Sequence, residues 1–415
     1  MSAPAVKSKA VKSKLVFDKD MTDVDPIPAA GIARAVALLE GGKLFRYGEQ
    51  GADQLEVTQL EKEFAAYMGR RYAAALNSCG STLFVALKCA GVQPGDKVLV
   101  NAFTLAPVPG AIAHAGAEAV FVEIDDDYKA DLDDLDRKAA ASGARVFLMS
   151  HMRGHIADMD RVMEICERHG LTLIEDCAHT LGASWDGRLS GSFGDIACFS
   201  FQTYKHINSG EGGVLVTDDE EVAAKAILYS GSYMLYAQHE ARPSLEVFER
   251  FKRMIPNLSL RMTNLAAAIA RPQIGLLKER GAAWNQRYAW LAERFAAIPR
   301  ITVPRRDPKE QFIASSIQFS LVGLSESQAI AFIDGCARRG VPIKWFGTKE
   351  PHGFTSRHVH WRYLPGAATL DRTDAILACL CDIRLPLSLT EADCDTIAAI
   401  MADEMAAVTG VTRES

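Results

Sequence analysis

Apolar and polar positions alternate along the chain in two patterns. Short apolar runs, which are typical of buried strands, occur at 72–76, 97–100, 119–124, 146–150, 171–174, 196–201 and 214–216. Between several of them apolar residues recur every three or four positions, as in helices with one buried face, at 57–68, 83–90, 156–169 and 221–228. This alternation predicts an α/β fold with a mostly parallel sheet and helices on both faces.

The pattern changes near residue 300. A long helical segment at 272–297 is followed by short predicted strands at 317–321 and 343–345, and by helices at 326–339 and 391–407. Thr390 stands directly before the last helix, where its hydroxyl can cap the first turn. We therefore expect a smaller α+β domain at the C-terminus, joined to the first domain by the long helix.

Composition narrows the class of protein. The 415 residues carry 46 Lys and Arg against 52 Asp and Glu, a net charge of −6, and no basic stripe is evident. Nucleic acid is therefore not an expected partner. The nine cysteines are scattered without a C-x-x-C pair, and neither a signal-peptide core nor a membrane-length apolar run is present. These features predict a soluble cytoplasmic enzyme that does not associate with a membrane.

The stretch 171–217 concentrates the candidate chemistry. Its first apolar run ends in Glu175 and Asp176, and its second, 196–201, leads to Lys205. Ligands of open α/β sheets bind beyond the carboxyl ends of the strands. We therefore expect an acid and a lysine at the ends of neighbouring strands, beside the glycine cluster at 209–213.

An acid and a lysine in this arrangement suit pyridoxal 5′-phosphate. The cofactor needs a lysine amine to hold its aldehyde as a Schiff base, and a carboxylate against its ring nitrogen so that the ring acts as an electron sink. Lys205 and Asp176 suit these two roles. A solvated surface lysine is the alternative for a single lysine after an aromatic run.

The complete sequence string is more specific than the spacing. The blocks EDCAHTLGA, GxxGDxxxFSFQxxK and SGEGGxxxT stand in order at 175–217, and together they closely resemble the DegT/StrS family of pyridoxal-phosphate aminotransferases. The resemblance extends from about residue 60 to the LPLSLTEAD segment at 385–393. It implies the type I fold, with a seven-stranded-type sheet, and transfer of an amino group to keto-sugars, cyclitols or related carbonyl compounds.

The same resemblance implies roles for single residues. Lys205 matches the Schiff-base lysine, Asp176 the partner of the ring nitrogen, and His179 the residue near the ring face. Ser200 matches a serine that contacts the cofactor phosphate in the family. Gln202, within FSFQ, resembles the glutamine-utilising branch of the family. Some relatives have histidine in place of the lysine and dehydrate sugars, so Lys205 favours transamination.

A phosphate site is expected where the strand 72–76 meets the following helix. The turn between them, NSCGST at 77–82, has small and hydroxyl residues, and amides at a helix start bind anions. Gly80 and Ser81 are the predicted contacts, and an ordinary helix cap is the alternative.

Two assignments depart from the family pattern. The family usually has an aromatic residue just after the threonine of NAFTLAP, where this chain has Leu105. Either Phe103 or His179 therefore covers the cofactor ring. Arg261 matches an arginine that the family offers to the cofactor phosphate of the neighbouring subunit. Ser259 stands two residues earlier, where the family usually has asparagine. This match implies a homodimer with shared active sites.

Three further positions stay open. Arg46 and Tyr47 either touch substrate or form a plain turn. Arg153 either binds a substrate carboxylate or forms a structural ion pair. His151 and His155 lack a third ligand, which argues against a metal site.

The expected organisation is a flexible tail over 1–20, a large cofactor-binding domain over 21–270, and a linking helix with the small domain over 271–415. The segment 21–56 is expected to pack at the mouth of the site. The expected reaction takes its amino group from glutamine or glutamate. The alternatives are a dehydration or amine oxidation with the same cofactor, and a regulator without catalysis.

Overall fold

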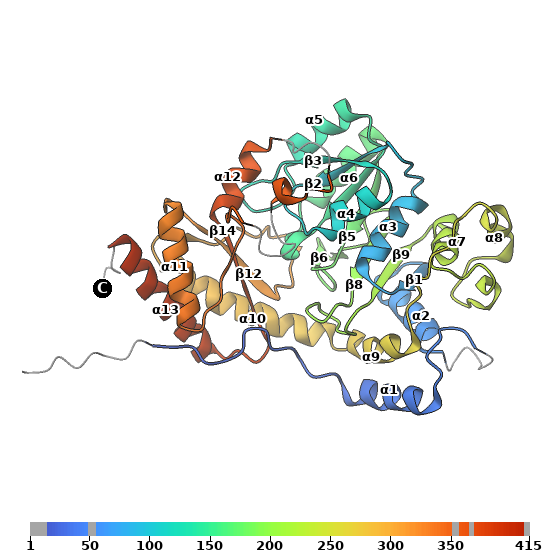
Figure 1. Cartoon of the computed structure of the whole chain (residues 1–415), viewed down its shortest axis with the longest axis horizontal. Helices are drawn as coiled ribbons and strands as arrows, with labels where there is room; N and C mark the ends of the chain where they lie inside the picture. Colours follow the sequence, from blue (N-terminus) through green and yellow to red (C-terminus); the bar gives the residue numbers. More distant parts are fainter. Residues whose placement is uncertain (1–14, 49–54, 351–356, 365–368, 411–415) are drawn as a thin grey trace, which may run out of the picture.

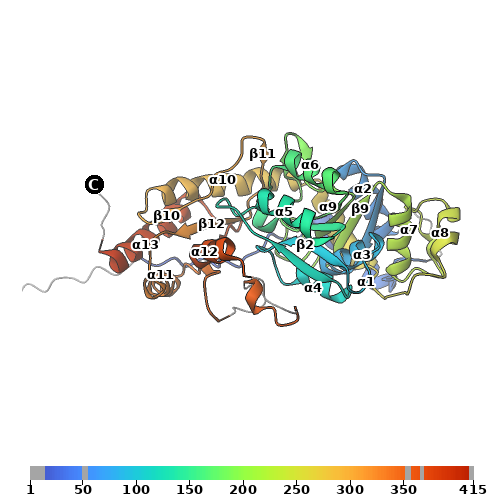
Figure 2. The ribbon, with the colours of Figure 1, turned by 90° about the horizontal axis from the view of Figure 1, so that it is seen from above.

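The computed structural model describes residues 15–48, 55–350, 357–364 and 369–410. Figure 1 shows a large domain beside a smaller one, drawn in orange and red, with the long helix α10 (Leu277–Ala296) reaching from one to the other. Seen from above, α10 runs along one side of the molecule (Figure 2).

The large domain is built on a seven-stranded sheet. In chain order its strands are β1 (Tyr72–Leu76), β2 (Lys97–Asn101), β3 (Glu118–Val122), β4 (Val146–Ser150), β5 (Thr172–Asp176), β8 (Ile196–Ser200) and β9 (Gly213–Thr217). Their spatial order is β1-β9-β8-β5-β4-β2-β3, and β9 runs opposite to the other six strands of this sheet. The predicted α/β class and mostly parallel sheet are confirmed.

Helices cover both faces of this sheet because its central strands are apolar on both sides. Ile174 of β5 packs in the core formed with α3, α4 and α7, and Leu173 packs in the core formed with α5 and α6. The bounds are α2 Glu56–Met68, α3 Cys79–Cys89, α4 Pro107–His114, α5 Leu132–Ser142, α6 Met159–His169, α7 Glu220–Tyr229 and α8 Leu245–Phe251. Alternate side chains of one strand thus hold two helical layers.

The small domain packs two long helices and a shorter one on an antiparallel sheet. The strand order is β10 (Ile301–Thr302), β12 (Ser316–Leu321), β14 (Leu380–Arg384) and β13 (Lys344–Trp345). The helices are α11 (Glu326–Arg338), α12 (Asp371–Cys379) and α13 (Glu391–Thr409). A short three-stranded sheet, β11 (Glu310–Gln311) with β6 (Ser184–Trp185) and β7 (Arg188–Leu189), reaches back to the large domain.

Two details of the C-terminal prediction are decided by the structure. Thr390 caps α13 as expected, because its hydroxyl accepts from the amide of Asp393 and the Asp393 carboxylate accepts from the amide of Thr390. The single helix expected over 272–297 is wrong. The chain instead forms α9 (Asn264–Ile274) and α10, with Gly275 between them, and a glycine at this position favours such a break.

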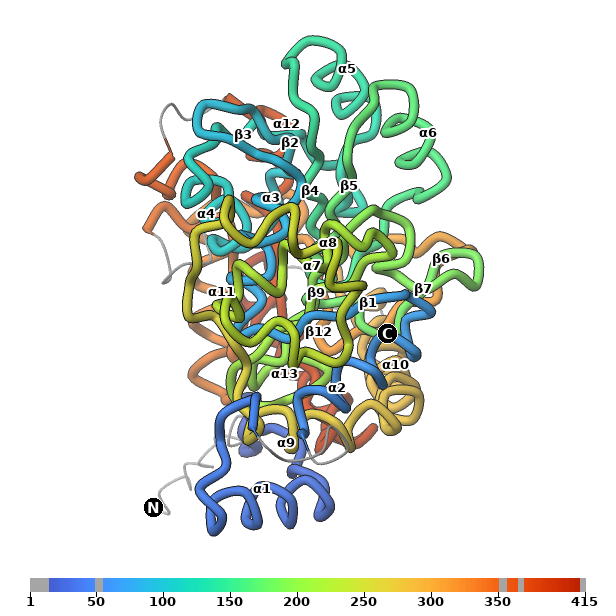
Figure 3. Tube along the Cα trace, turned by 90° about the vertical axis from the view of Figure 1, so that its right-hand side faces the viewer, coloured from blue at the N-terminus to red at the C-terminus, as the bar shows by residue number. Residues whose placement is uncertain are grey.

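The N-terminal tail was expected to be flexible up to residue 20, and this is wrong for residues 15–20. Phe17 is buried, and its amide donates to the carbonyl of Arg339 at 2.8 Å. The Arg339 guanidinium donates to the carbonyl of Leu15 at 2.7 Å. The segment therefore lies along the small domain before the chain reaches α1 (Ala29–Gly41), which packs on α9 at the bottom of the large domain (Figures 1 and 3). Residues 1–14 lie outside the described residues.

Arg46 and Tyr47 are neither a plain turn nor open to substrate. Arg46 is 1% exposed, and its guanidinium forms a two-pronged ion pair with Glu61 at 3.0 and 2.8 Å. The Tyr47 hydroxyl lies 3.0 Å from His239 Nδ1, and His239 Nε2 lies 3.0 Å from the Glu61 carboxylate. These side chains form a closed, buried ionic network.

We expect Glu61→Gln to destabilise the protein by about 3–5 kcal/mol at pH 7, because the variant leaves the buried guanidinium without its charged partner. Burial alone would raise the pKa of Glu61, but Arg46 and His239 outweigh burial and lower it from 4.5 to about 2. This contribution is fully present above pH 4.5 and is lost as pH falls from 4.5 through about 2.

Urea unfolding of wild type and variant between pH 7 and pH 3 measures this difference. Glu63→Gln is the matched control, because Glu63 pairs with Arg271 at the surface, and it should cost less than about 1 kcal/mol. A Glu61→Gln variant as stable as wild type at pH 7 would contradict the assigned network.

Two bulk properties complete the fold. Within the described residues no helix is long and apolar enough to cross a membrane. All nine cysteines lie within these residues and are free thiols.

Candidate active site

The sheet places the predicted acid and lysine at the ends of neighbouring strands. Asp176 is the last residue of β5, and it stands opposite Cys198 of β8 in parallel register. Lys205 follows β8 after a short turn that Gln202 stabilises. The backbone carbonyl of Gln202 accepts from the Lys205 amide, and the side-chain oxygen of Gln202 accepts from the Tyr204 amide at 2.9 Å. The local fold thus returns the lysine toward the strand ends.

Asp176 is held in one orientation. It is 5% exposed, and Ser150, the last residue of β4, donates its hydroxyl to Oδ2 at 2.8 Å. The Ala178 amide donates to Oδ1 at 3.2 Å, and the Cys79 thiol lies 3.9 Å from the same oxygen. Ser150 was not predicted from the sequence, although its position at the end of the predicted strand next to Asp176 indicates a residue of the site.

Lys205 and His179 form the second half of the site. Lys205 Nζ lies 2.9 Å from His179 Nε2. Burial, and next the charge of Lys205, lowers the pKa of His179 well below 6.5, so the imidazole is neutral and accepts from the lysine. Burial also lowers the pKa of Lys205 to about 8, assisted by Arg153 and opposed by Asp176. A lysine with this pKa can exchange a proton near neutral pH.

The predicted anion site lies at the start of α3. Ser78 caps the helix by accepting from the Ser81 amide at 3.1 Å. Gly213 of β9 lies so close that a Cβ on it would be 2.5 Å from the Ser78 backbone. Because Ser200 of β8 pairs with Gly213, this close approach brings Ser200 beside the helix start. Free amides there favour an anion.

Gly80 and Ser81 lie in the first turn of that helix. A Cβ on Gly80 would meet nothing closer than 3.9 Å, so the space beside this residue is open. The Ser81 hydroxyl donates to Asn77 Oδ1 at 2.7 Å and lies 2.9 Å from the Ser78 hydroxyl. The turn therefore combines a helix cap, which was the alternative interpretation, with an open approach for an anion.

The Phe103 side chain is buried in the core and does not face the site. Its ring is 1% exposed and packs edge-on against Phe346 at 5.1 Å and Tyr128 at 6.4 Å. Of the two residues considered for the ring face, His179 is the one that contacts Lys205. Stacking of Phe103 on a cofactor therefore rests on the sequence alone.

Arg261 lies beside the anion site through its backbone. It pairs with Leu76 at the end of β1, and the preceding residue accepts from the Asn77 amide at 2.8 Å. Its guanidinium donates to the Gly231 carbonyl at 2.6 Å and lies over the Phe45 ring at 5.5 Å. Within one protomer, therefore, the Arg261 side chain contacts the loop at Gly231, next to the anion site.

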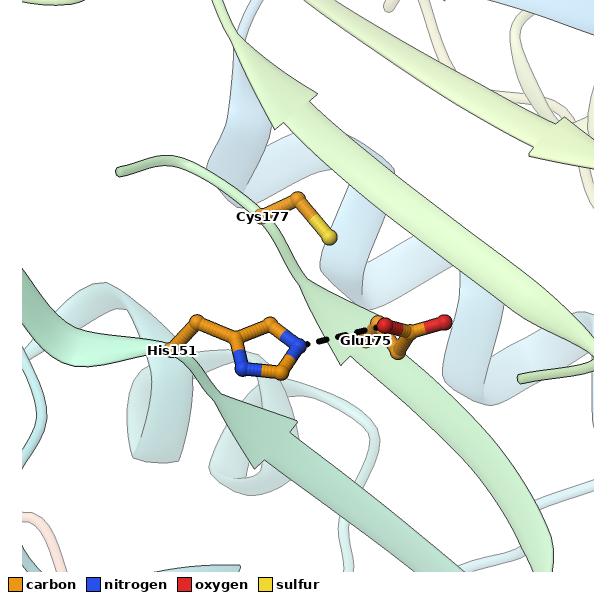
Figure 4. Close-up of side chains that lie close together, drawn as sticks. All are labelled: His151, Glu175 and Cys177. Atoms are coloured by element: carbon orange, nitrogen blue, oxygen red, sulfur yellow. Dashed lines mark hydrogen bonds and ion pairs between the residues drawn. The ribbon is translucent and has the colours of Figure 1, made fainter. Parts of the chain in front are cut away.

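Next to the site, three buried residues, His151, Glu175 and Cys177, connect the end of β4 to β5. Figure 4 shows His151 Nε2 directed at the Glu175 carboxylate, 3.1 Å away, with Cys177 nearby. The three residues are close enough to hold a metal ion, but Glu175 already accepts from the amides of Gly191, Phe193 and Gly194. Burial raises the pKa of the Cys177 thiol well above its ordinary value, which opposes the thiolate that a metal needs. We therefore interpret the group as a structural anchor.

The other polar residues left open by the sequence are also placed. His155 is not part of this anchor, because its Nε2 lies 2.8 Å from Gln318 in the small domain. Arg153 forms an ion pair with Asp382 at 3.0 Å. The structural alternative for Arg153 is therefore present, and its guanidinium also lies in the wall of a cavity.

That cavity has a volume of about 690 Å³ and lies where the small domain meets the site. Its charged wall combines basic and acidic side chains in equal number: Arg153, Lys344, Lys349 and Arg384 with Glu326, Asp334, Glu350 and Asp382. Ile330, Ile333, Pro342, Ile343 and Trp345 contribute apolar surface. Arg384 also lines a narrower cleft beside Lys205 and lies 4.0 Å over the Tyr204 ring. Lys344 and Trp345, which could face either the cleft or solvent on the sequence alone, are half-buried in this wall.

Known proteins resemble the chain along most of its length. The model of the DegT/DnrJ/EryC1/StrS aminotransferase family matches residues 31–401. GDP-perosamine synthase of Caulobacter vibrioides is 31% identical over 356 residues, 83% of this chain and 89% of that protein. Spore coat polysaccharide biosynthesis protein SpsC of Bacillus subtilis is 34% identical over 250 residues, 60% of this chain and 64% of that protein. The crystal structure of 3-amino-5-hydroxybenzoic acid synthase superposes with a TM-score of 0.79 at 27% identity, covering 94% of this chain and 98% of that one.

Proposed function

The chain belongs to the DegT/DnrJ/EryC1/StrS aminotransferase family, and from this premise we propose that it moves an amino group from glutamine or glutamate to a keto-sugar, cyclitol or related carbonyl acceptor. It is an aminotransferase whose cofactor is pyridoxal 5′-phosphate. The observation that carries the proposal is the meeting of Lys205 with His179 beside the buried Asp176.

The residues of the site fit this cofactor. Lys205 would hold the aldehyde carbon, and Asp176 would bind the ring nitrogen. The helix start with Gly80 and Ser81, together with Ser200, would bind the phosphate, because it offers free amides and open space where an anion is favoured. When bound, the cofactor supplies an electron sink for the carbanion that forms on the substrate carbon.

The side chains then act on protons. Lys205 takes the proton from the substrate carbon and returns one during the transfer, because its pKa of about 8 lets both forms exist near neutral pH. Asp176 would keep the ring nitrogen protonated, and Ser150 holds that carboxylate in place. Neutral His179 accepts from the lysine and would cover the ring face.

We also propose a homodimer in which Arg261 reaches the partner's phosphate. Large apolar side chains are exposed around Arg261, as expected for a surface that associates: Phe45 is 51% exposed, Met234 73% and Leu258 40%. Free thiols throughout are compatible with a reducing compartment such as the cytoplasm.

Absorbance of the purified holoenzyme tests the reaction. Addition of glutamine or glutamate should move the cofactor band from the violet-blue region to the ultraviolet and release one keto acid per protomer. A band that ignores both donors would contradict the proposed donors. Turnover without stoichiometric keto acid would indicate a dehydration or oxidation instead. A protein that binds the cofactor and changes no substrate would be a regulator.

A further inference from the structure

The segment that precedes α1 is anchored on the small domain at its start. We call residues 17–25 the N-terminal strap. Phe17 is buried, and a Cβ on Gly340 would lie 1.8 Å from the Phe17 carbonyl oxygen, so the two backbones are in direct contact. The Lys19 ammonium donates to the Asp393 carboxylate at 2.6 Å. These contacts fix the first three residues of the strap.

The rest of the strap makes a turn and is held again at its far end. The amide and the hydroxyl of Thr22 both donate to Asp20 Oδ1 at 2.7 Å. Met21, inside this turn, is directed inward and is 4% exposed. The Asp25 carboxylate forms an ion pair with Arg280 of α10 at 3.7 Å. The course of the strap is therefore defined from both ends.

Consecutive residues of the strap line the two spaces beside the site. Met21 and Thr22 lie in the wall of the large cavity between the small domain and the site. Residues 23–25 lie in the wall of the narrow cleft that contains Lys205. Arg384 lines both spaces. The strap thus passes from one space to the other on the outer side of the site.

The strap leaves little room beside Lys205. The cleft has a volume of about 40 Å³, against about 690 Å³ for the cavity, so it holds only a few water molecules. A segment held by a small number of contacts at its ends opens more easily than a strand within a sheet. Release of the strap would therefore expose both spaces to solvent at once.

We propose that the N-terminal strap is the outer wall of the active site and limits the size of the molecules that reach Lys205. The proposal rests on the proposed aminotransferase function, because Lys205 is the amine whose access is limited. Selection among amino donors and carbonyl acceptors then depends in part on a segment outside the range 31–401 that the family model matches. Such a wall also excludes water, which suppresses unproductive reactions of a reactive cofactor.

Two variants release the strap at its first anchor. Phe17→Ala removes a core side chain, and Lys19→Met removes the ion pair without changing the core. Val16→Ala is the matched control, because Val16 directly precedes the strap and is 58% exposed. An endoproteinase that cleaves before aspartate reports release, since Asp18 is the first aspartate of the chain. Retained cofactor absorbance and a cooperative melting transition show that each variant is folded.

Access to Lys205 in the holoenzyme is measured with hydroxylamine and with the larger O-benzylhydroxylamine. Each reagent forms an oxime with the cofactor aldehyde, releases the lysine amine and bleaches the violet-blue band. For Phe17→Ala we expect strap cleavage and bleaching by the larger reagent to be about tenfold faster than in wild type or more, and bleaching by hydroxylamine to stay within about threefold. Lys19→Met should change in the same direction by a smaller factor, and Val16→Ala should match wild type.

Faster strap cleavage with an unchanged ratio of the two bleaching rates would overturn the proposal, because the strap would then be structural only. Strap cleavage as slow in Phe17→Ala and Lys19→Met as in wild type would also overturn it, since the assigned contacts would not hold the segment. An equal gain in Val16→Ala would do the same. Failure of the aminotransferase function would look different: hydroxylamine would bleach the band of wild type, and neither glutamine nor glutamate would.

Discussion

Replacing Lys205 with alanine lowers the rate of amino transfer by about 10⁴-fold or more. The variant loses both the amine that holds the cofactor aldehyde and the base that moves the proton. His179 lies 2.9 Å from the lysine amine in the wild type, but burial lowers its pKa well below 6.5, so it is too weak a base to replace the lysine. The measurement is keto acid released from glutamate or glutamine in a single turnover, together with the absorbance spectrum.

The matched control for this variant is Lys278→Ala, which removes an exposed lysine from α10 and should leave the rate within about twofold, since surface changes away from a site are nearly neutral. Cofactor retained without the violet-blue band would show that Lys205→Ala still folds. Undiminished turnover by Lys205→Ala would refute the assignment of this lysine.

Asp176→Asn is expected to lower the rate by about 10²–10³-fold, in the range found when a preorganised electrostatic partner is removed from a site. Asparagine keeps the shape and still accepts from Ser150, but it does not hold the cofactor ring nitrogen in its protonated form. The electron sink is therefore weakened while the binding of the phosphate at the α3 start is untouched. Single-turnover rates and cofactor affinity, measured separately, distinguish these two effects.

Ser150→Ala provides the comparison for Asp176. It removes only the 2.8 Å hydrogen bond that orients the carboxylate, so we expect a loss of about tenfold, the equivalent of one hydrogen bond to a charged group. If Asp176→Asn were no slower than Ser150→Ala, the carboxylate charge would have no special role and its pairing with the ring nitrogen would be wrong.

The sheet, and the proximity of Asp176, His179 and Lys205, could be predicted from the sequence for one physical reason. Buried strands in a parallel sheet are nearly continuous apolar runs, so β4 and β5 were visible as such, and their ends define one edge. Asp176 ends β5 and Lys205 follows the neighbouring strand β8, and the contact of Lys205 with His179 needs only local turns. Agreement with the family then fixed the class of reaction.

Positions that depend on distant parts of the chain were not predictable in this way. The Arg46 pair with Glu61 and His239 joins three separate segments, and the burial of Phe17 depends on Arg339 in the small domain. Polar residues in turns and tails look exposed in a sequence, because nothing local shows which partner covers them.

The cavity was missed for the same reason. Arg153 follows β4, whereas Lys344 and Asp382 lie on β13 and β14 of the small domain. Only the packing of the two domains brings them together, and a lone lysine on a short strand is ordinarily a surface residue. Specificity built from several elements therefore stays hidden until the fold is known.

The most direct test of the central claim is to reduce the holoenzyme with borohydride and to map the modified peptide by mass spectrometry. Reduction fixes the cofactor to the lysine that carries it. We predict one phosphopyridoxyl group per protomer, located on Lys205, and none after prior conversion of the enzyme with its amino donor. Modification of a different lysine, or of none in a protein saturated with pyridoxal 5′-phosphate, would contradict the proposed active site.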